Sequence, residues 1–167
     1  MSNGTVRRAT AADVDALVRL RAEMFAAMNV ADTDELWRTN AHRWFSDRID
    51  ESDYCFVVVE VDAQVVSCAA GAIRDAAPSP AVPDGRDILV SNVSTAPAFR
   101  GRGYGRAAFD GVMAWARQVG VRRAELMATA FGRGMYVRAG FQDTSFPAMR
   151  AALGEAWSLD SDRGKQQ

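Results

Sequence analysis

A short turn rich in glycine and arginine is the part of the sequence best suited to chemistry. It contains, in order, Arg100, Gly101, Arg102, Gly103, Tyr104, Gly105 and Arg106. Glycine allows positive φ and leaves no Cβ in the way, so several consecutive backbone N–H groups can face one bulky anion. A helix that starts here adds its unpaired N–H groups and its dipole. The spacing predicts a site for a group such as pyrophosphate, although the same glycines also suit a purely structural bend.

The elements around the turn follow from hydrophobic periodicity. Helical spacing predicts helices over 10–28, 32–50, from the turn to 120, and over 134–139. Runs rich in β-formers predict strands over 5–9, 54–61, 64–73, from 88 onward, over 123–129 and over 148–153. Thr10 and Asp13 have the spacing of a capping box at the first helix. We expect one domain over 1–153 and a loosely ordered tail over 154–167.

Two connections are less regular than the elements that they join. Ala63 occupies a place where a tight hairpin turn favours glycine, so we expect the loop after residue 61 to exceed two residues. The segment 74–87 contains three prolines and Gly85, and it is long for a connection inside a domain. It is either a lid over a binding site or a tolerated insertion.

Composition excludes several classes of protein. A net charge of −1 over 167 residues argues against a nucleic-acid-binding domain. There is no apolar run near ~18 residues, and positions 1–9 lack the apolar stretch of a signal peptide, so we expect a soluble cytoplasmic protein without a membrane partner. Cys55 and Cys68 have no metal-ligand spacing, which predicts buried, reduced thiols and no metal site.

Other polar and aromatic groups have both ordinary and functional interpretations. The acidic residues Asp32, Asp34 and Glu35 suit a helix N-terminus, or they receive a cationic substrate. The aromatic residues Trp37, Trp44 and Phe45 recur at helical spacing, which is typical of a core and also allows an aromatic cage. His42 is the only histidine and has no evident catalytic partner in sequence.

A dinucleotide-binding turn is the first alternative to consider for the glycines. Gly103, Gly105 and Ala108 formally match the dinucleotide fingerprint, and Glu125 lies near the spacing of its acidic residue. However, Glu125 falls at the start of its expected strand, where it cannot reach a ribose. The turn also follows an expected hairpin rather than a βαβ series. These features disfavour the dinucleotide interpretation.

Two linked motifs resemble those of the GNAT superfamily of N-acyltransferases. Residues 92–106 resemble the acyl-CoA-binding motif, whose core is Arg/Gln-x-x-Gly-x-Gly/Ala after a strand and a Val-x-Pro. Residues 135–141 resemble the family's Leu-Tyr-x-x-x-Gly-Phe signature, and the two motifs lie at the usual separation. Thr95 departs from the usual valine, and Thr129 stands where many members have asparagine.

The resemblance implies a fold and a co-substrate. It implies an α/β (α+β) domain with a mixed, mostly antiparallel central sheet flanked by helices, in which a splayed strand pair holds acetyl-CoA. Backbone groups of Val93, Ser94 and Thr95 would pair with the pantetheine, and an N–H near Val93 would stabilise the developing oxyanion. Residues 100–106 would hold the pyrophosphate, and Thr129 joins this binding set. Homodimers are frequent in the family.

The implied reaction is transfer of an acetyl group to a primary amine of a small molecule or a protein, by direct attack. By its motif position Tyr136 is the general acid for the departing thiolate, and its alternative role is aromatic packing. Glu60 and Asp87 are both candidates for the base, and the sequence does not choose between them. The alternative function is a non-catalytic acyl-CoA-binding module that regulates a partner.

Overall fold

The computed structural model describes residues 4–32 and 34–153, so the tail expected at 154–167 lies outside the described residues. A five-stranded sheet has the order β1-β2-β3-β4-β5, antiparallel except for the parallel pair β4 and β5. The strands are β1 (Thr5–Arg8), β2 (Tyr54–Val61), β3 (Gln64–Asp75), β4 (Arg86–Thr95) and β5 (Ala124–Glu125). The helices are η1 (Ala11–Asp13), α1 (Val14–Ala27), α2 (Leu36–Arg48), η2 (Pro97–Phe99), α3 (Tyr104–Gln118) and α4 (Arg133–Arg138). The expected mixed, mostly antiparallel sheet flanked by helices is confirmed.

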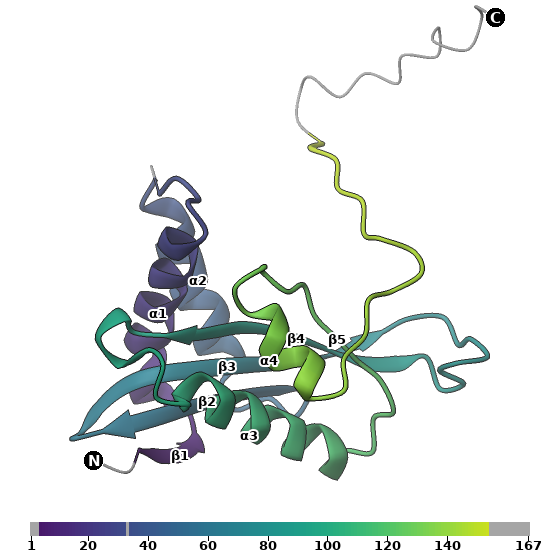
Figure 1. Ribbon diagram of the computed structural model, residues 1–167, viewed down its shortest axis with the longest axis horizontal. Helices are drawn as coiled ribbons and strands as arrows, with labels where there is room; N and C mark the ends of the chain where they lie inside the picture. Colours follow the sequence, from purple (N-terminus) through teal and green to yellow (C-terminus); the bar gives the residue numbers. More distant parts are fainter. Residues whose placement is uncertain (1–3, 33, 154–167) are drawn as a thin grey trace, which may run out of the picture.

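The sheet is covered on both faces, because alternate residues of its strands enter two separate cores. On β2, Val57 and Val59 pack toward α3, whereas Phe56 and Val58 pack toward α1 and α2. Figure 1 shows α1 and α2 together on one side of the sheet and α3 with α4 on the other. The strongest apolar stripe is on α3, whose buried residues are Ala108, Phe109, Val112, Trp115 and Ala116. Two buried layers therefore fix the sheet between them.

The N-terminal half follows the sequence patterns closely. The first helical segment begins after Thr10, whose N–H donates to the Asp13 carboxylate at 2.8 Å, as the capping-box spacing predicts.

The β2–β3 loop is tighter than expected. It has two residues, Asp62 and Ala63, with φ of 48° and 62°. The expectation of a longer loop was wrong because Ala63 adopts the left-handed conformation that the turn requires.

The connection between β3 and β4 is also more ordered than expected. The two strands pair out to Asp75 and Arg86, which leaves 76–85 as the loop, with a bridge between Ser79 and Val82. This loop lies at the end of the sheet remote from α1 and α2 (Figure 1).

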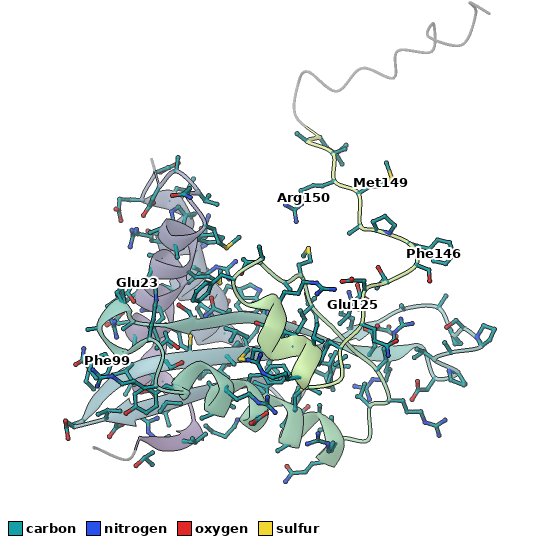
Figure 2. The ribbon with its side chains drawn as sticks, in the orientation of Figure 1. Glu23, Phe99, Glu125, Phe146, Met149 and Arg150 are labelled. Carbon is teal, nitrogen blue, oxygen red and sulfur yellow. The ribbon has the colours of Figure 1, made fainter. Side chains whose placement is uncertain are left out.

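The C-terminal part departs most from expectation. β5 has two residues where a strand over 123–129 was expected, and no strand forms over 148–153 in the described chain. The latter segment has no β-branched residue to favour a strand. Phe146 and Met149 are 90% and 97% exposed and point away from the body of the domain (Figure 2). Within the described ranges, no helix has the length and apolar character needed to cross a membrane.

Candidate active site

A bulge in β4 creates the first feature of the site. The pairing of β4 with β3 shifts register between Ser91, opposite Ala70, and Ser94, opposite Cys68, so Asn92 and Val93 have no partner residue in β3. Asn92 has φ of 53°, a left-handed conformation that asparagine tolerates better than most residues. The bulge turns backbone groups out of the β-ladder.

The opposite edge of β4 is open along the same stretch. β5 pairs only with Ile88 and Leu89, so in the described chain Val90–Thr95 have no strand beside them on that edge. The parallel pair therefore stops just before the bulge. A linear group with amide-like donors and acceptors could pair with this exposed backbone.

Side chains from neighbouring elements hold the bulge in place. The Cys68 thiol donates to the Asn92 carbonyl oxygen at 3.2 Å, and the Asn92 amide nitrogen lies 3.4 Å from Cys68 Sγ. Arg21 donates from Nη1 to Asn92 Oδ1 at 3.1 Å, and Ser94 Oγ donates to the Leu20 carbonyl oxygen at 2.8 Å. Because α1 contributes two of these bonds, the bulge is fixed from the α1 face of the sheet.

The glycine turn lies directly after β4 and η2. Gly101 and Gly103 have φ of 74° and 84°, and a Cβ added to either would meet no protein atom within 4 Å. Within the described chain, no carbonyl or side chain accepts a hydrogen bond from five of its backbone N–H groups, those of Gly101, Arg102, Gly103, Gly105 and Arg106. The turn thus has the open space and the unpaired donors that binding of an anion requires.

The three arginines of the turn have local partners. Arg100 donates from Nε to the Thr95 carbonyl oxygen at 3.0 Å, and the Arg102 guanidinium lies 5.5 Å from the centre of the Phe99 ring. Arg106 donates from Nε to Asp110 at 2.7 Å. These contacts hold three positive charges around the turn.

Tyr136 is a half-buried residue of α4. Its ring contacts Phe109 of α3 at 5.5 Å and Phe141 at 6.1 Å between centroids. Burial raises the pKa of its hydroxyl, which keeps the hydroxyl protonated at neutral pH. Thr129 stands before the same helix, where its Oγ1 accepts a hydrogen bond from the Gly132 N–H at 3.1 Å. The aromatic contacts orient Tyr136, and Thr129 caps the turn that begins α4.

The two candidate bases are both engaged by arginine. The Glu60 carboxylate accepts from Arg7 Nη2 at 2.6 Å, and the same arginine also binds Asp13. Asp87 is 4% exposed and receives bonds at 2.8 Å from both Arg74 and Arg123. Asp87 also lies six residues before Val93 on β4, a distance of about 15–20 Å along a strand.

A pocket of about 740 Å³ opens beside the bulge, on the α1 and α2 face. Its wall includes Phe25, Trp37, Trp44 and Phe45, together with Ser91 and Asn92 of β4. The wall does not include Glu60, Asp87, Tyr136 or any residue of the 76–85 loop. Tyr136 and Val93 instead both pack against the core on the α3 face of the sheet. The expected aromatic set therefore contributes to the core and to the pocket at once, because Phe45 also packs on Phe56 at 5.3 Å.

Comparison with known proteins decides the family. The sequence profile of the acetyltransferase (GNAT) family matches residues 15–141. The chain belongs to this family. The match includes the glycine turn, the β4 bulge and Tyr136, so the resemblance found in the two sequence motifs is confirmed. A search of curated protein sequences finds no match.

Solved structures share the GNAT fold. A predicted acetyltransferase with acetyl-CoA from Clostridium acetobutylicum has a TM-score of 0.82 at 23% identity, over 89% of this chain and 96% of its own. A GCN5-related N-acetyltransferase from Ralstonia eutropha has a TM-score of 0.76 at 23% identity, over 89% and 99%. Glucosamine-6-phosphate N-acetyltransferase from Arabidopsis thaliana has a TM-score of 0.70 at 15% identity, over 89% and 98%. At these identities the likeness concerns the fold.

Arg21 is a functional candidate of this GNAT domain that the sequence patterns above do not include; it lines the pocket and binds the bulge. Its position on the helix could have indicated it. Arg21 lies four residues after Leu17 and four before Phe25, so an arginine occupies the helix face that carries apolar residues. A charged residue on such a face is a candidate for a functional role.

The two cysteines of the GNAT domain are buried, as the sequence predicts. Burial raises the pKa of the Cys55 thiol to about 11 and that of the Cys68 thiol to about 12. Both thiols are therefore protonated at neutral pH, and neither is part of the pocket wall. This arrangement disfavours a covalent cysteine intermediate.

We expect Asp87→Asn to destabilise the protein without a large loss of activity. Burial opposes ionisation of Asp87, but the hydrogen bonds from Arg74 and Arg123 outweigh it and lower the pKa of the carboxyl. Removing the charge should lower the free energy of unfolding by about 1–2 kcal/mol, because both guanidinium groups are partly exposed and screened by solvent.

The pH dependence of unfolding in urea tests this assignment. Because the folded-state pKa of Asp87 is lowered, its stabilisation is present above the unfolded pKa of about 3.9 and is lost as pH falls through the folded pKa. The difference between wild type and Asp87→Asn should therefore shrink below about pH 4. A fall in kcat of about 100-fold or more in the folded variant would instead make Asp87 the base.

Proposed function

We propose that this chain transfers an acetyl group from acetyl-CoA to a primary amine by direct attack, with Tyr136 as general acid. The observation that carries the proposal is the continuity of three features. The exposed strand edge over 90–95 contains the bulge, the open glycine turn follows at 100–106, and a pocket opens beside the bulge. The turn would bind a pyrophosphate, the strand edge would pair with an extended pantetheine, and the pocket would hold the reacting amine.

The donor side of the site fits acetyl-CoA. Bound acetyl-CoA would supply an acetyl group activated as a thioester. The N–H groups of the turn would hold its pyrophosphate, and the backbone of Val93–Thr95 would pair with its pantetheine. A backbone N–H at the bulge, beside Val93, would donate to the acetyl oxygen as negative charge develops there. The crystal structure of the Clostridium relative with acetyl-CoA supports this choice of donor.

Tyr136 would act at the end of the reaction. As the amine nitrogen bonds to the acetyl carbon, the carbon–sulfur bond breaks and the departing thiolate needs a proton. A phenol whose pKa is raised by burial remains protonated at neutral pH and can donate it. Its ring is oriented by Phe109 and Phe141, which suits a group that must point in one direction.

The amine must lose its own proton to react. A lysine-like amine has a pKa of about 10.4, so deprotonation at pH 7 costs roughly 4.6 kcal/mol. Glu60 and Asp87 both bind arginines, so we favour structural roles for them. We propose that the amine delivers its proton to water at the open side of the pocket. The rate should then rise with pH toward the pKa of the amine.

Turnover of acetyl-CoA against pooled primary amines, read as released thiol, tests the proposed function. We expect at least one pool to release thiol well above the rate of hydrolysis without amine, and mass spectrometry to find an acetylated amine. The pools should contain small amines and lysine-containing peptides. Tight binding of acetyl-CoA with no acetylation of any pool would contradict catalysis and favour the regulatory module.

A further inference from the structure

The wall of the pocket beside the bulge indicates the size and character of the acceptor. Its volume of about 740 Å³ lies within the range typical of small-molecule sites. Aromatic rings from α1 and α2 form much of the wall, with Phe25 and Trp37 in edge contact at 5.6 Å between centroids. An apolar body of the size of an aromatic or branched side chain would occupy part of such a space and leave room for a further group.

The wall also contains a cation that lacks a matching anion. Arg21 is half-buried, and its guanidinium lies 4.9 Å from the centre of the Phe25 ring. One N–H, on Nη1, donates to Asn92 Oδ1 at 3.1 Å, and within the described ranges no carboxylate forms an ion pair with this side chain. Burial lowers the pKa of Arg21, which reflects the cost of keeping its charge in apolar surroundings. An anion in the pocket would offset that cost.

The acidic residue on the same wall is already paired. Asp32 accepts a hydrogen bond from the Trp37 indole nitrogen at 2.7 Å and also binds Arg38. The bond from Trp37 and then the bond from Arg38 lower the pKa of this carboxyl. The unpaired charge of the pocket is therefore positive, which disfavours the cationic substrate considered for Asp32 from the sequence.

We propose that the acceptor is a primary amine with an apolar body and an oxyanion, a carboxylate or a phosphate, that binds Arg21. This inference rests on the proposed function, because it gives the substrate class of the same site. The N–H groups of Arg21 that Asn92 does not use can hold two oxygens in bidentate fashion. Because Arg21 bonds Asn92 and Asn92 precedes Val93, the oxyanion would lie close to the reacting amine.

Amines that share one body test the inference. Tyramine, tyrosine and the phosphonate analogue of tyrosine carry no anion, a carboxylate and a phosphonate on the carbon that bears the amine. Isoamylamine and leucine form a second pair, without and with a carboxylate. The wild type should prefer an anionic member of a set by at least about 10-fold in kcat/KM, and Arg21→Gln should remove most of that preference. Arg21→Lys should keep part of it. The anion that the wild type prefers shows whether the site binds a carboxylate or a phosphate-like group.

Two controls separate recognition from structure. Arg19→Gln removes the same charge from the same helix at a residue that binds the Val65 carbonyl oxygen, and it should leave the preference unchanged. If Arg21 only positions the bulge, Arg21→Gln should slow anionic and neutral amines equally. Thermal unfolding and acetyl-CoA affinity show whether the variant is folded.

The outcomes distinguish this inference from the proposed function. If the wild type acetylates neutral amines faster than anionic ones, and Arg21→Gln has the same preference, the inference is overturned and the proposed function is upheld. If no amine is acetylated, binding of N-acetyltyrosine and N-acetyltyramine can be measured by ligand-observed NMR. If N-acetyltyrosine binds more weakly to Arg21→Gln than to wild type, the anion site is upheld without the reaction. If the wild type binds N-acetyltyrosine and N-acetyltyramine equally, the anion site is overturned.

Discussion

Gly103→Ala is expected to weaken acetyl-CoA binding by about 10- to 100-fold. Gly103 has φ of 84° and precedes the first turn of α3. Alanine in this conformation costs about 1–2 kcal/mol, so part of the population of turns should relax away from it. A loss of one or two N–H bonds to a charged phosphate accounts for the expected change in affinity. Isothermal titration with acetyl-CoA measures it directly.

Gly120→Ala is the matched control at the other end of α3. Gly120 has φ of 74°, and a Cβ there also meets no atom within 4 Å. Both variants should lose a similar free energy of unfolding, about 1–2 kcal/mol, and only Gly103→Ala should lose affinity. Equal affinity of the two variants for acetyl-CoA would contradict the anion site at the turn.

Tyr136→Phe is expected to lower kcat by about 100-fold or more, with acetyl-CoA affinity within about twofold of wild type. The change removes one hydroxyl and keeps the ring that packs on Phe109 and Phe141, so the fold should persist. General acid catalysis typically contributes factors of about 10²–10⁴. Steady-state kinetics with saturating acetyl-CoA measures the loss once an acceptor is known.

The pH profile gives a second test of the same role. Because burial raises the pKa of Tyr136, its acid form persists at least to the usual tyrosine pKa of about 10. Wild-type kcat should therefore not fall on the alkaline side below about pH 10. Tyr54→Phe, which removes a hydroxyl on β2, should behave as wild type. Unchanged kcat in Tyr136→Phe would assign Tyr136 to packing alone.

Much of the fold could be predicted because its signals are local. The α3 stripe, the capping box at Thr10 and the glycine turn each lie within one short segment of sequence, and each forms as expected. The family resemblance has the same origin, since both motifs are short and their order is fixed. Local signals also failed where tertiary contacts decide, as in the short β5 and the missing strand over 148–153.

The candidate site was less predictable because its charges are paired over long separations. Glu60 meets Arg7 across 53 residues, and Asp87 meets Arg123 across 36. No spacing near either carboxylate in the sequence shows which arginines are its partners. The register shift at Asn92 depends in the same way on Cys68 and Arg21, which belong to other elements. Sequence patterns identify candidate chemical groups, but only the fold shows which of those groups are not already paired with other side chains.

The buried thiols have a practical consequence for the turnover assays that measure released thiol. Coenzyme A released in the reaction carries a free thiol, whereas Cys55 and Cys68 are fully enclosed and protonated. A chromogenic disulfide reagent added to native enzyme should therefore report only product, with negligible background from the protein. Turnover can be followed continuously, without quenching and without replacing either cysteine.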